Sequence, residues 1–301
     1  MTEVRAQRMP WRCVADVGAG VGEVPTWDPL TGRLYWLDLY GPTLSAADAA
    51  GKFIGRWTLP DMPGSFGLRP DGQGAVVATA SGVYDLAFGS GTLARLHEAP
   101  YDQSDYRFND GRCDRQGRLW FGTNRKPRSL KPAGSASFWR LDRDGLSEQF
   151  SGITIANGIA FSPAGDTMYI ADSPRDEIVV FDYDRSAGKV SGRRTFATVP
   201  GGSFPDGAAI DSEGGYWVAL FNSARIARFL PSGKLDRVVE SPVPQPTMIC
   251  FGGPGLTTLY LTSARRFLSE AAAASAKLSG GIFACPIDVA GLAEPYVDAA
   301  I

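Results

Sequence analysis

The sequence is poor in the residues on which several common catalytic sites depend. It has a single histidine, His97, and its four cysteines (Cys13, Cys113, Cys250 and Cys285) lie far apart with no C-x-x-C pair. A Ser-His-Asp or Cys-His hydrolase would have to use that histidine, and the chain has no G-x-S-x-G elbow. A zinc-thiolate or redox site has no support either. We expect a strand-end or surface histidine and reduced thiols packed in strands.

An excess of one charge and long hydrophobic runs are also lacking. The formal net charge is −2 and the pI is about 5.6, so we expect neither nucleic acid nor an anionic membrane as a partner. No apolar run approaches the ~20 residues of a membrane-spanning helix. The first residues hold no apolar signal core, which predicts a cytoplasmic protein. The composition carries no signal for an oligomeric state.

Glycine is plentiful, with 36 residues, and the glycines mark a repeat. Six times, a polar turn ending in glycine leads into a short strand of aromatic and aliphatic residues, as in "DRQGRLWFGT" and "DSEGGYWVAL". The turn glycines recur at intervals in the forties: Gly32, Gly72, Gly117, Gly165, Gly214 and Gly255. Such a repeat of short strands and glycine-rich hairpins is typical of a β-propeller. We predict an all-β fold, a six-bladed β-propeller of four strands per blade, forming one domain over residues 1–301.

The two ends of the chain carry further predictions. Residues 11–17 can pair with the C-terminal end and complete the last blade, whereas residues 269–278 read as a helix that interrupts it. About ten N-terminal residues could be disordered, as chain termini often are. Equivalent positions of three repeats hold tryptophans that we expect to pack between blades: Trp36, Trp120 and Trp217.

A second pattern lies before the six turns. Eight residues before each turn glycine, or nine in the first copy, whose turn is longer, the chain enters the innermost strand of a blade. These positions hold Glu23, Gly64, Asn109, Asn157, Asp206 and Thr247. Innermost strands line the central channel, so the six residues should form a ring at its mouth. We name them the ring residues.

The ring brings two carboxylates and two amides together from separate blades. Oxygen donors of this kind bind a hard divalent cation. Asn-Gly and Asp-Gly are also ordinary turn dipeptides, and one of them alone would mean little. Four oxygen side chains at one repeat position are a more specific signal, and Glu23 is not a turn former. The sequence therefore predicts a metal site in the central channel.

Taken together, five blocks of the sequence resemble the SMP-30/gluconolactonase/luciferin-regenerating family. They are "GEVPTWDPLTGRLYWLDL", "RFNDGRCDRQGRLWFGT", "ANGIAFSPAGDTMYIADS", "FPDGAAIDSEGGYWVA" and "MICFGGPGLTTLYLTSAR". The resemblance runs in order over nearly the whole chain. It implies a six-bladed propeller with one divalent metal ion in the channel and the hydrolysis of a sugar (aldono-) lactone to the sugar acid.

Matched residue by residue, the resemblance implies Glu23, Asn157 and Asp206 as metal ligands. It implies Arg107 and Asn109 as residues that bind the substrate. The metal would bind the lactone carbonyl oxygen as a Lewis acid, and it could be Ca²⁺, Zn²⁺, Mg²⁺, Mn²⁺ or Fe²⁺. Asp206 is the candidate catalytic base, with a metal-bound hydroxide as the alternative.

One segment departs from the family pattern. Animal members have acidic residues shortly after a G-T-M segment that help define the sugar pocket, whereas this chain continues with Asn124, Arg125 and Lys126. A basic segment at this point makes an acidic or otherwise modified sugar acid lactone conceivable. Asp172 follows another inner-strand copy, where it could support the metal ligands or cap a turn.

Two other functions stay open at this point. A propeller can bind a metal only to hold its channel together and act as a binding protein or scaffold. Three protein oxygens leave coordination positions open for water and substrate, which favours an enzyme. A propeller esterase of the paraoxonase type is the second alternative. The missing histidine argues against it, as does Arg107, which suits a polyhydroxylated substrate.

Overall fold

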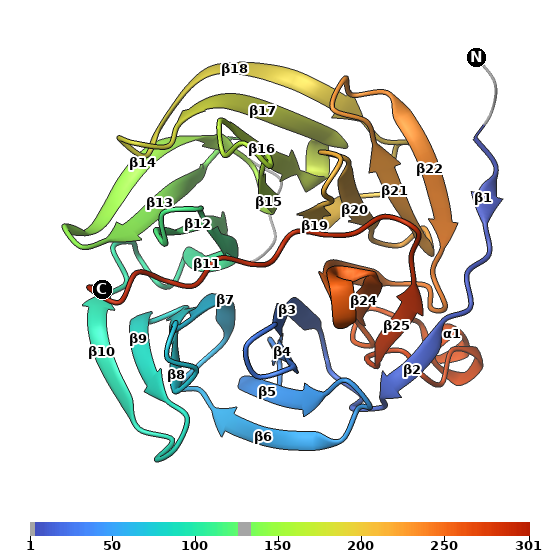
Figure 1. Cartoon of the computed structure of the whole chain (residues 1–301), viewed down its shortest axis with the longest axis horizontal. Coiled ribbons are helices and arrows are strands. Elements are labelled where there is room, and N and C mark those ends of the chain that lie inside the picture. The colour runs from blue at the N-terminus through green and yellow to red at the C-terminus, as the bar shows by residue number, and fades with distance from the viewer. Residues whose placement is uncertain (1–3, 126–133) are drawn as a thin grey trace.

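Short strands joined by tight turns form six sheets arranged around one axis (Figure 1). The computed structural model describes residues 4–125 and 134–301. Apart from two N-terminal strands that join the last two blades from the outside, the chain enters every sheet at the channel and adds its next strands outwards. The six-bladed all-β propeller predicted from the repeat is therefore confirmed.

The first three blades follow the chain in order. Blade 1 contains β3 (Gly22–Asp28), β4 (Arg33–Asp38), β5 (Thr43–Asp48) and β6 (Phe53–Thr58). Blade 2 contains β7 (Pro63–Leu68), β8 (Gly74–Thr79), β9 (Gly82–Ala87) and β10 (Leu93–Glu98). Blade 3 contains β11 (Tyr106–Cys113), β12 (Leu119–Arg125), β13 (Ala136–Asp142) and β14 (Gly145–Ile153).

The other three blades have the same plan. Blade 4 contains β15 (Ala156–Phe161), β16 (Thr167–Asp172), β17 (Glu177–Asp184) and β18 (Lys189–Thr198), with the short helix η1 (Ser173–Arg175) after β16. Blade 5 contains β19 (Pro205–Ile210), β20 (Tyr216–Leu220), β21 (Arg225–Phe229) and β22 (Leu235–Glu240). Blade 6 contains β23 (Pro246–Gly252), β24 (Thr258–Ser263) and β25 (Ile282–Pro286), with η2 (Pro254–Leu256) between the first two.

An N-terminal strand closes the ring of blades, as predicted. Strand β2 (Arg12–Ala15) pairs antiparallel with β25 and becomes the outer strand of blade 6. The predicted helix is also present, as α1 (Glu270–Ser275), between β24 and β25. Its first turn is capped by Ser269, whose side chain accepts a hydrogen bond from the backbone of Ala272. Among the described residues, no helix is long and apolar enough to cross a membrane.

Blade 5 departs from the predicted four strands. Strand β1 (Ala6–Gln7) pairs in parallel with the outer strand β22, at Val238 and Val239. The indole nitrogen of Trp11 donates to the carbonyl oxygen of Glu240 at 2.8 Å and fixes the same segment. At these two residues the outer strand is covered by a neighbour, as edge strands often are. The sequence pattern missed this strand because two residues carry no periodicity.

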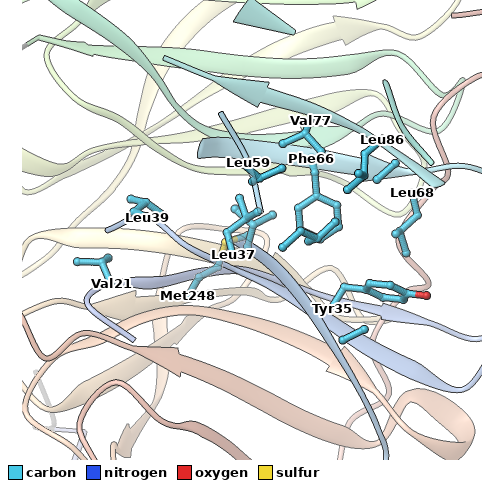
Figure 2. Close-up of a cluster of buried hydrophobic side chains, with 14 of the residues drawn as sticks. Val21, Tyr35, Leu37, Leu39, Leu59, Phe66, Leu68, Val77, Leu86 and Met248 are labelled. Carbon is cyan, nitrogen blue, oxygen red and sulfur yellow. The ribbon is translucent and has the colours of Figure 1, made fainter. Parts of the chain in front are cut away.

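The core lies between neighbouring blades. One cluster joins blades 1 and 2 around Tyr35, Leu37 and Phe66 (Figure 2). The three repeat tryptophans are fully buried, each in a cluster shared with an adjacent blade. This confirms their predicted packing role, and burying a large apolar side chain contributes about 1.5–3 kcal/mol. The four cysteines are free thiols in strands, and all except the half-buried Cys13 are buried, as expected.

The chain ends with a segment that the sequence analysis did not predict. After β25, residues 287–298, which we name the closing segment, cross the middle of the disc (Figure 1). The segment accepts a backbone hydrogen bond from Ser212 in blade 5 and donates to Leu68 in blade 2 and Gly117 in blade 3. It therefore ties three blades together across one end of the channel.

Candidate active site

Every innermost strand loses register with its neighbour at the ring position. The breaks lie between Glu23 and Thr26, Pro63 and Ser65, Phe108 and Gly111, Asn157 and Ala160, Pro205 and Ala208, and Pro246 and Ile249. A bulge bends its strand and re-aims a side chain. The ring residues therefore sit where six blades can turn side chains out of the regular pleat.

Four of the six ring residues line one cavity. Glu23, Asn109, Asn157 and Asp206 contribute to a hollow of about 280 Å³ at the end of the channel opposite the closing segment. They come from blades 1, 3, 4 and 5. The sequence-based grouping of these four residues thus corresponds to one place in the structure.

The other two ring residues do not line the cavity. Gly64 has no side chain, and an added Cβ would lie 2.6 Å from the carbonyl oxygen of Phe108 in the next blade. Thr247 is buried, and its hydroxyl donates to the carbonyl oxygen of Gly22 at 2.5 Å. Thr247 joins two adjacent inner strands, and Gly64 allows two inner strands to approach closely, so the oxygen donors of the cavity come from blades 1, 3, 4 and 5.

A chain of hydrogen bonds fixes the two ring amides. The Nδ2 atom of Asn109 donates to the carbonyl oxygen of Ala156 at 2.8 Å and to Oδ1 of Asn157 at 2.6 Å. Nδ2 of Asn157 donates to the hydroxyl of Ser173 at 2.8 Å, which donates to the carbonyl oxygen of Pro205 at 2.7 Å. Both amide nitrogens are therefore committed to protein partners, and the oxygens are acceptors, with one of the two acceptor positions of Asn157 Oδ1 already used by Asn109.

Ser173 is a site residue that the sequence analysis missed. It is buried, lines the cavity and begins η1. The one feature of the sequence that could have identified it is its position directly after strand β16, which pairs with the strand that carries Asn157. That position brings Ser173 beside a ring residue but gives no hint of its chemistry.

The site concentrates negative charge away from water. Burial raises the pKa of Glu23 well above its usual range, and the nearby charges of Asp206 and then Asp110 raise it further. Burial also raises the pKa of Asp110 to about 6, although Arg112 opposes this shift. The buried Oδ1 atom of Asp110 has no hydrogen-bond partner in the described parts of the chain. Mutual repulsion of buried carboxylates is relieved by a bound cation.

The donor set fits a metal ion of the hard type. Glu23 and Asp206 offer carboxylate oxygens and Asn157 an amide oxygen to the same cavity. Within residues 4–125 and 134–301, no three His, Cys, Asp or Glu side chains group as a metal site. The set found here contains an amide, and it is typical of ions that prefer oxygen ligands.

The backbone is strained beside two of the donors. Val24, which follows Glu23, has a φ of 49°, and Phe204, two residues before Asp206, has a φ of 39°. Side chains other than glycine rarely adopt this region, and such strain gathers at functional sites. Gly158, after Asn157, has a φ of 60°, and an added Cβ would lie 2.4 Å from the Tyr216 hydroxyl. The glycine of this "NG" block is thus required by geometry.

The cavity also has an apolar part, which the sequence analysis did not identify. Three of its residues stand two places before a ring donor: Val21, Ile155 and Phe204. Leu39, Pro174, Phe221 and Phe267 complete what we name the apolar wall. In Figure 2, Val21 and Leu39 lie at one end of the core cluster, so the wall continues the core. The two-residue spacing was visible in the sequence, but all three residues lie directly before the inner strands rather than in them.

The remaining predicted residues lie elsewhere. Arg107 is buried and donates to the carbonyl oxygen of Phe108 at 2.9 Å, and it is not among the described residues of the cavity lining. Its charge lowers the pKa of Glu23, so it is electrostatically close to the site. Its predicted contact with substrate stays a prediction. His97 lies near the end of β10, the outermost strand of blade 2, away from the cavity.

The predicted basic segment does not form the described cavity lining. Asn124 is buried in β12, where it pairs with Arg107, and Arg125 ends the same strand. Lys126 lies outside the described residues. Asp172 accepts hydrogen bonds from the backbone of Thr154 and Ile155, the segment leading to Asn157. These bonds hold the segment next to a ring donor, and the side chain of Asp172 makes no capping hydrogen bond to η1.

A larger hollow of about 540 Å³ lies between blades 4 and 5. Ser162, Gly214 and Pro231 from three turns line it, and no ring residue does. Space alone therefore does not identify the site. The smaller cavity is the candidate because it alone, among the described hollows, gathers the four ring donors.

Comparison with curated proteins finds relatives along nearly the whole chain. A 6-deoxy-6-sulfogluconolactonase of Pseudomonas putida is 37% identical over 287 residues, which cover 94% of this chain and 97% of that protein. An L-arabinolactonase of Azospirillum brasilense is 36% identical over 93% of both chains.

Solved structures and a family match agree with these relatives. A calcium-binding protein, regucalcin, from Agrobacterium tumefaciens superposes with a TM-score of 0.91 at 27% identity and covers 98% of this chain and 99% of its own. Residues 21–265 match the family described as the SMP-30/Gluconolactonase/LRE-like region. The matched region contains all six ring residues and ends before the closing segment. The chain belongs to the SMP-30/gluconolactonase/LRE-like family.

Proposed function

We propose that this protein is a lactonase that hydrolyses a sugar (aldono-) lactone to the sugar acid with the help of one divalent metal ion. The observation that carries the proposal is the convergence of oxygen side chains from four blades on one cavity. Relatives named as lactonases of two different sugars, each matching over most of its length, support it.

In this proposal Glu23, Asn157 and Asp206 hold the metal. When bound, the metal supplies Lewis-acid chemistry at the lactone carbonyl. Three protein oxygens would leave coordination positions for water and substrate, which supports an enzyme over a scaffold. Ca²⁺, Mg²⁺ and Mn²⁺ suit an all-oxygen set, and Zn²⁺ and Fe²⁺ also accept such ligands.

Side chains of the protein are proposed to supply the base and to bind the substrate. Asp206 takes the proton of the attacking water as general base, a role typically worth ~10²–10⁴-fold in rate. Asn109 already uses both amide hydrogens within the protein, so we expect its Oδ1 to accept a hydrogen bond from a sugar hydroxyl. Arg107 is proposed to bind the substrate, and its charge partly opposes the upward pKa shift of Glu23.

The test is lactone hydrolysis on a panel of aldonolactones, with untreated, chelated and singly metal-reconstituted protein. We expect hydrolysis of at least one lactone, lost on chelation and restored by a divalent metal. Metal binding with no hydrolysis of any lactone would favour the scaffold. Aryl ester hydrolysis in the absence of lactone hydrolysis would favour the paraoxonase type.

A further inference from the structure

The cavity has two amides at its floor and an exposed aromatic ring at its mouth. Asn109 and Asn157 are each only 8% exposed, whereas Phe267 in the loop between β24 and α1 is 42% exposed. Both amides and the aromatic ring line the same hollow. A molecule bound to the amides at the floor would therefore also reach the carbon surface of this ring at the mouth.

The aromatic side chains of the mouth are held in place. Phe267 meets Phe221 edge to face, with ring centroids 6.2 Å apart, and meets Tyr40 in the same way at 6.1 Å. The guanidinium of Arg266 lies 4.1 Å from the centre of the Tyr40 ring. The backbone amide of Arg266 donates to the carbonyl oxygen of Gly20, which anchors the loop to blade 1. Phe267 is thus a positioned surface.

One polar side chain, Asn222, also stands at the mouth. It is exposed, and its Oδ1 atom accepts a hydrogen bond from Nε2 of Gln245 at 2.9 Å. One of its acceptor positions is thereby used within the protein. None of the described lining residues is cationic.

We propose that this site selects sugar lactones whose last carbon carries no hydroxyl, that is, deoxy lactones that end in a methyl group. The inference rests on the proposed function, because the floor would hold the lactone carbonyl. The far end of the sugar then packs against Phe267 and Phe221. A methyl group packs on this surface, whereas a hydroxyl placed against the two rings finds no hydrogen-bond partner on them.

The proposal separates this chain from its relative named for a sulfonated sugar. A sulfonate at the last carbon is an anion, and an anion needs cations or several hydrogen-bond donors. The described lining offers aromatic rings at that end instead. The two proteins would share the chemistry at the floor and differ at the mouth.

The experiment compares two substrates that differ by one hydroxyl, L-rhamnono-γ-lactone and L-mannono-γ-lactone. We expect kcat/KM of the metal-loaded protein to be about tenfold higher for the deoxy lactone, the lower end of what apolar pockets achieve. Phe267→Ala should bring the ratio of the two values close to one. Phe267→Gln, which adds a hydrogen-bonding group, should shift it towards L-mannono-γ-lactone.

Phe53→Ala is the matched control. Phe53 is 47% exposed, close to the exposure of Phe267, but lies on β6, the outermost strand of blade 1. It should leave the ratio unchanged. A wild-type ratio of one or less, a ratio insensitive to Phe267→Ala, or faster hydrolysis of a sulfonated lactone would overturn the proposal.

The failure of the proposed function would be seen separately. If the wild type hydrolysed neither lactone, binding of L-rhamnonate and L-mannonate by calorimetry would read the same selectivity. About tenfold tighter binding of L-rhamnonate than of L-mannonate, lost in Phe267→Ala, would support the proposed selectivity of the mouth even if the protein is not a lactonase. Equal binding, or no binding of either acid, would overturn it.

Discussion

The two ends of the central channel are built from the same six strands and are finished in different ways. At one end the strands begin with register breaks and leave a cavity of about 280 Å³ among carboxylates and amides. At the other end the closing segment lies against the strands, and the hollows beside Arg112 and Glu294 are about 20 Å³ each. A hollow of that size has room for about one water molecule.

The charges at the two ends are also arranged differently. At the closed end Arg112 is buried, forms an ion pair with Glu294 and donates to the carbonyl oxygen of Ala208 at 2.6 Å. At the open end Glu23 and Asp206 repel each other. The ion pair at the closed end helps to hold the blades together, and the two neighbouring carboxylates at the open end are suited to bind a cation. The residues that stabilise the propeller and the residues of the candidate active site therefore lie at opposite ends of the channel.

The strongest test of this comparison is Asp206→Asn at the open end. The change keeps an oxygen for the metal but removes a negative charge and the base. We expect kcat to fall by ~10²-fold or more even at saturating metal. Steady-state hydrolysis over a metal titration measures the loss.

Asn157→Ala is the control for this prediction. An amide cannot act as the base, so its defect should be mainly weaker metal affinity, and excess metal should rescue it in large part. Wild-type activity of both variants with no metal bound would show that the metal-lactonase interpretation is wrong. Full rescue of Asp206→Asn by metal would leave Asp206 as a ligand only.

The open end could be predicted from the sequence because its signal repeats. Four oxygen residues occupy one position of a six-fold repeat, and the structure brings those four to one cavity. Glu23 was found in spite of a longer turn, since Glu is unusual at a turn. Arg107 came from the family resemblance alone, and it is not among the described lining residues.

The closed end could not be predicted because its contacts are not periodic. Residues 287–298 have no alternating pattern, and their hydrogen bonds reach residues such as Leu68 and Gly117, far away in the chain. Ser173 and Phe267 were not identified from the sequence for a related reason. Each lies just outside a strand, where the neighbouring blade rather than the local pattern decides what a side chain contacts.

At the closed end, Glu294→Gln should affect stability and spare activity. It leaves Arg112, whose side chain is 8% exposed, without its charged partner. We expect the free energy of unfolding to fall by about 3 kcal/mol, with kcat/KM unchanged at a temperature where the variant is folded. Chemical denaturation and lactone hydrolysis measure the two effects.

Glu270→Gln on the exposed helix α1 is the matched control, and we expect its stability to stay within about 0.5 kcal/mol of wild type. Lost activity without lost stability in Glu294→Gln would show that the two ends are coupled. The two ends of the channel would then not have separate roles in stability and activity.

A smaller effect is expected from Ser173→Ala. The change removes the acceptor for Nδ2 of Asn157, so the amide oxygen is less firmly directed at the metal. A hydrogen bond is worth about 1 kcal/mol, and we expect the metal Kd by calorimetry to rise by up to about tenfold. The kcat at saturating metal should stay near wild type.

Ser65→Ala provides the comparison for Ser173→Ala. Ser65 is a buried serine of an inner strand whose hydroxyl has no partner in the described parts of the chain. Its metal Kd should match wild type. Equal effects of the two serine variants would remove the case for Ser173 as a positioning residue.

The smallest effect is expected from His97→Ala. The imidazole lies on β10, three strands out from the channel in blade 2, and pairs with Val83 on β9. Neither end of the channel contains it, so kcat/KM should stay within a few-fold of wild type. A loss near the ~10⁴ typical of a triad member would mean that chemistry occurs on the outer face of a blade. In that case the active site would lie at neither end of the channel.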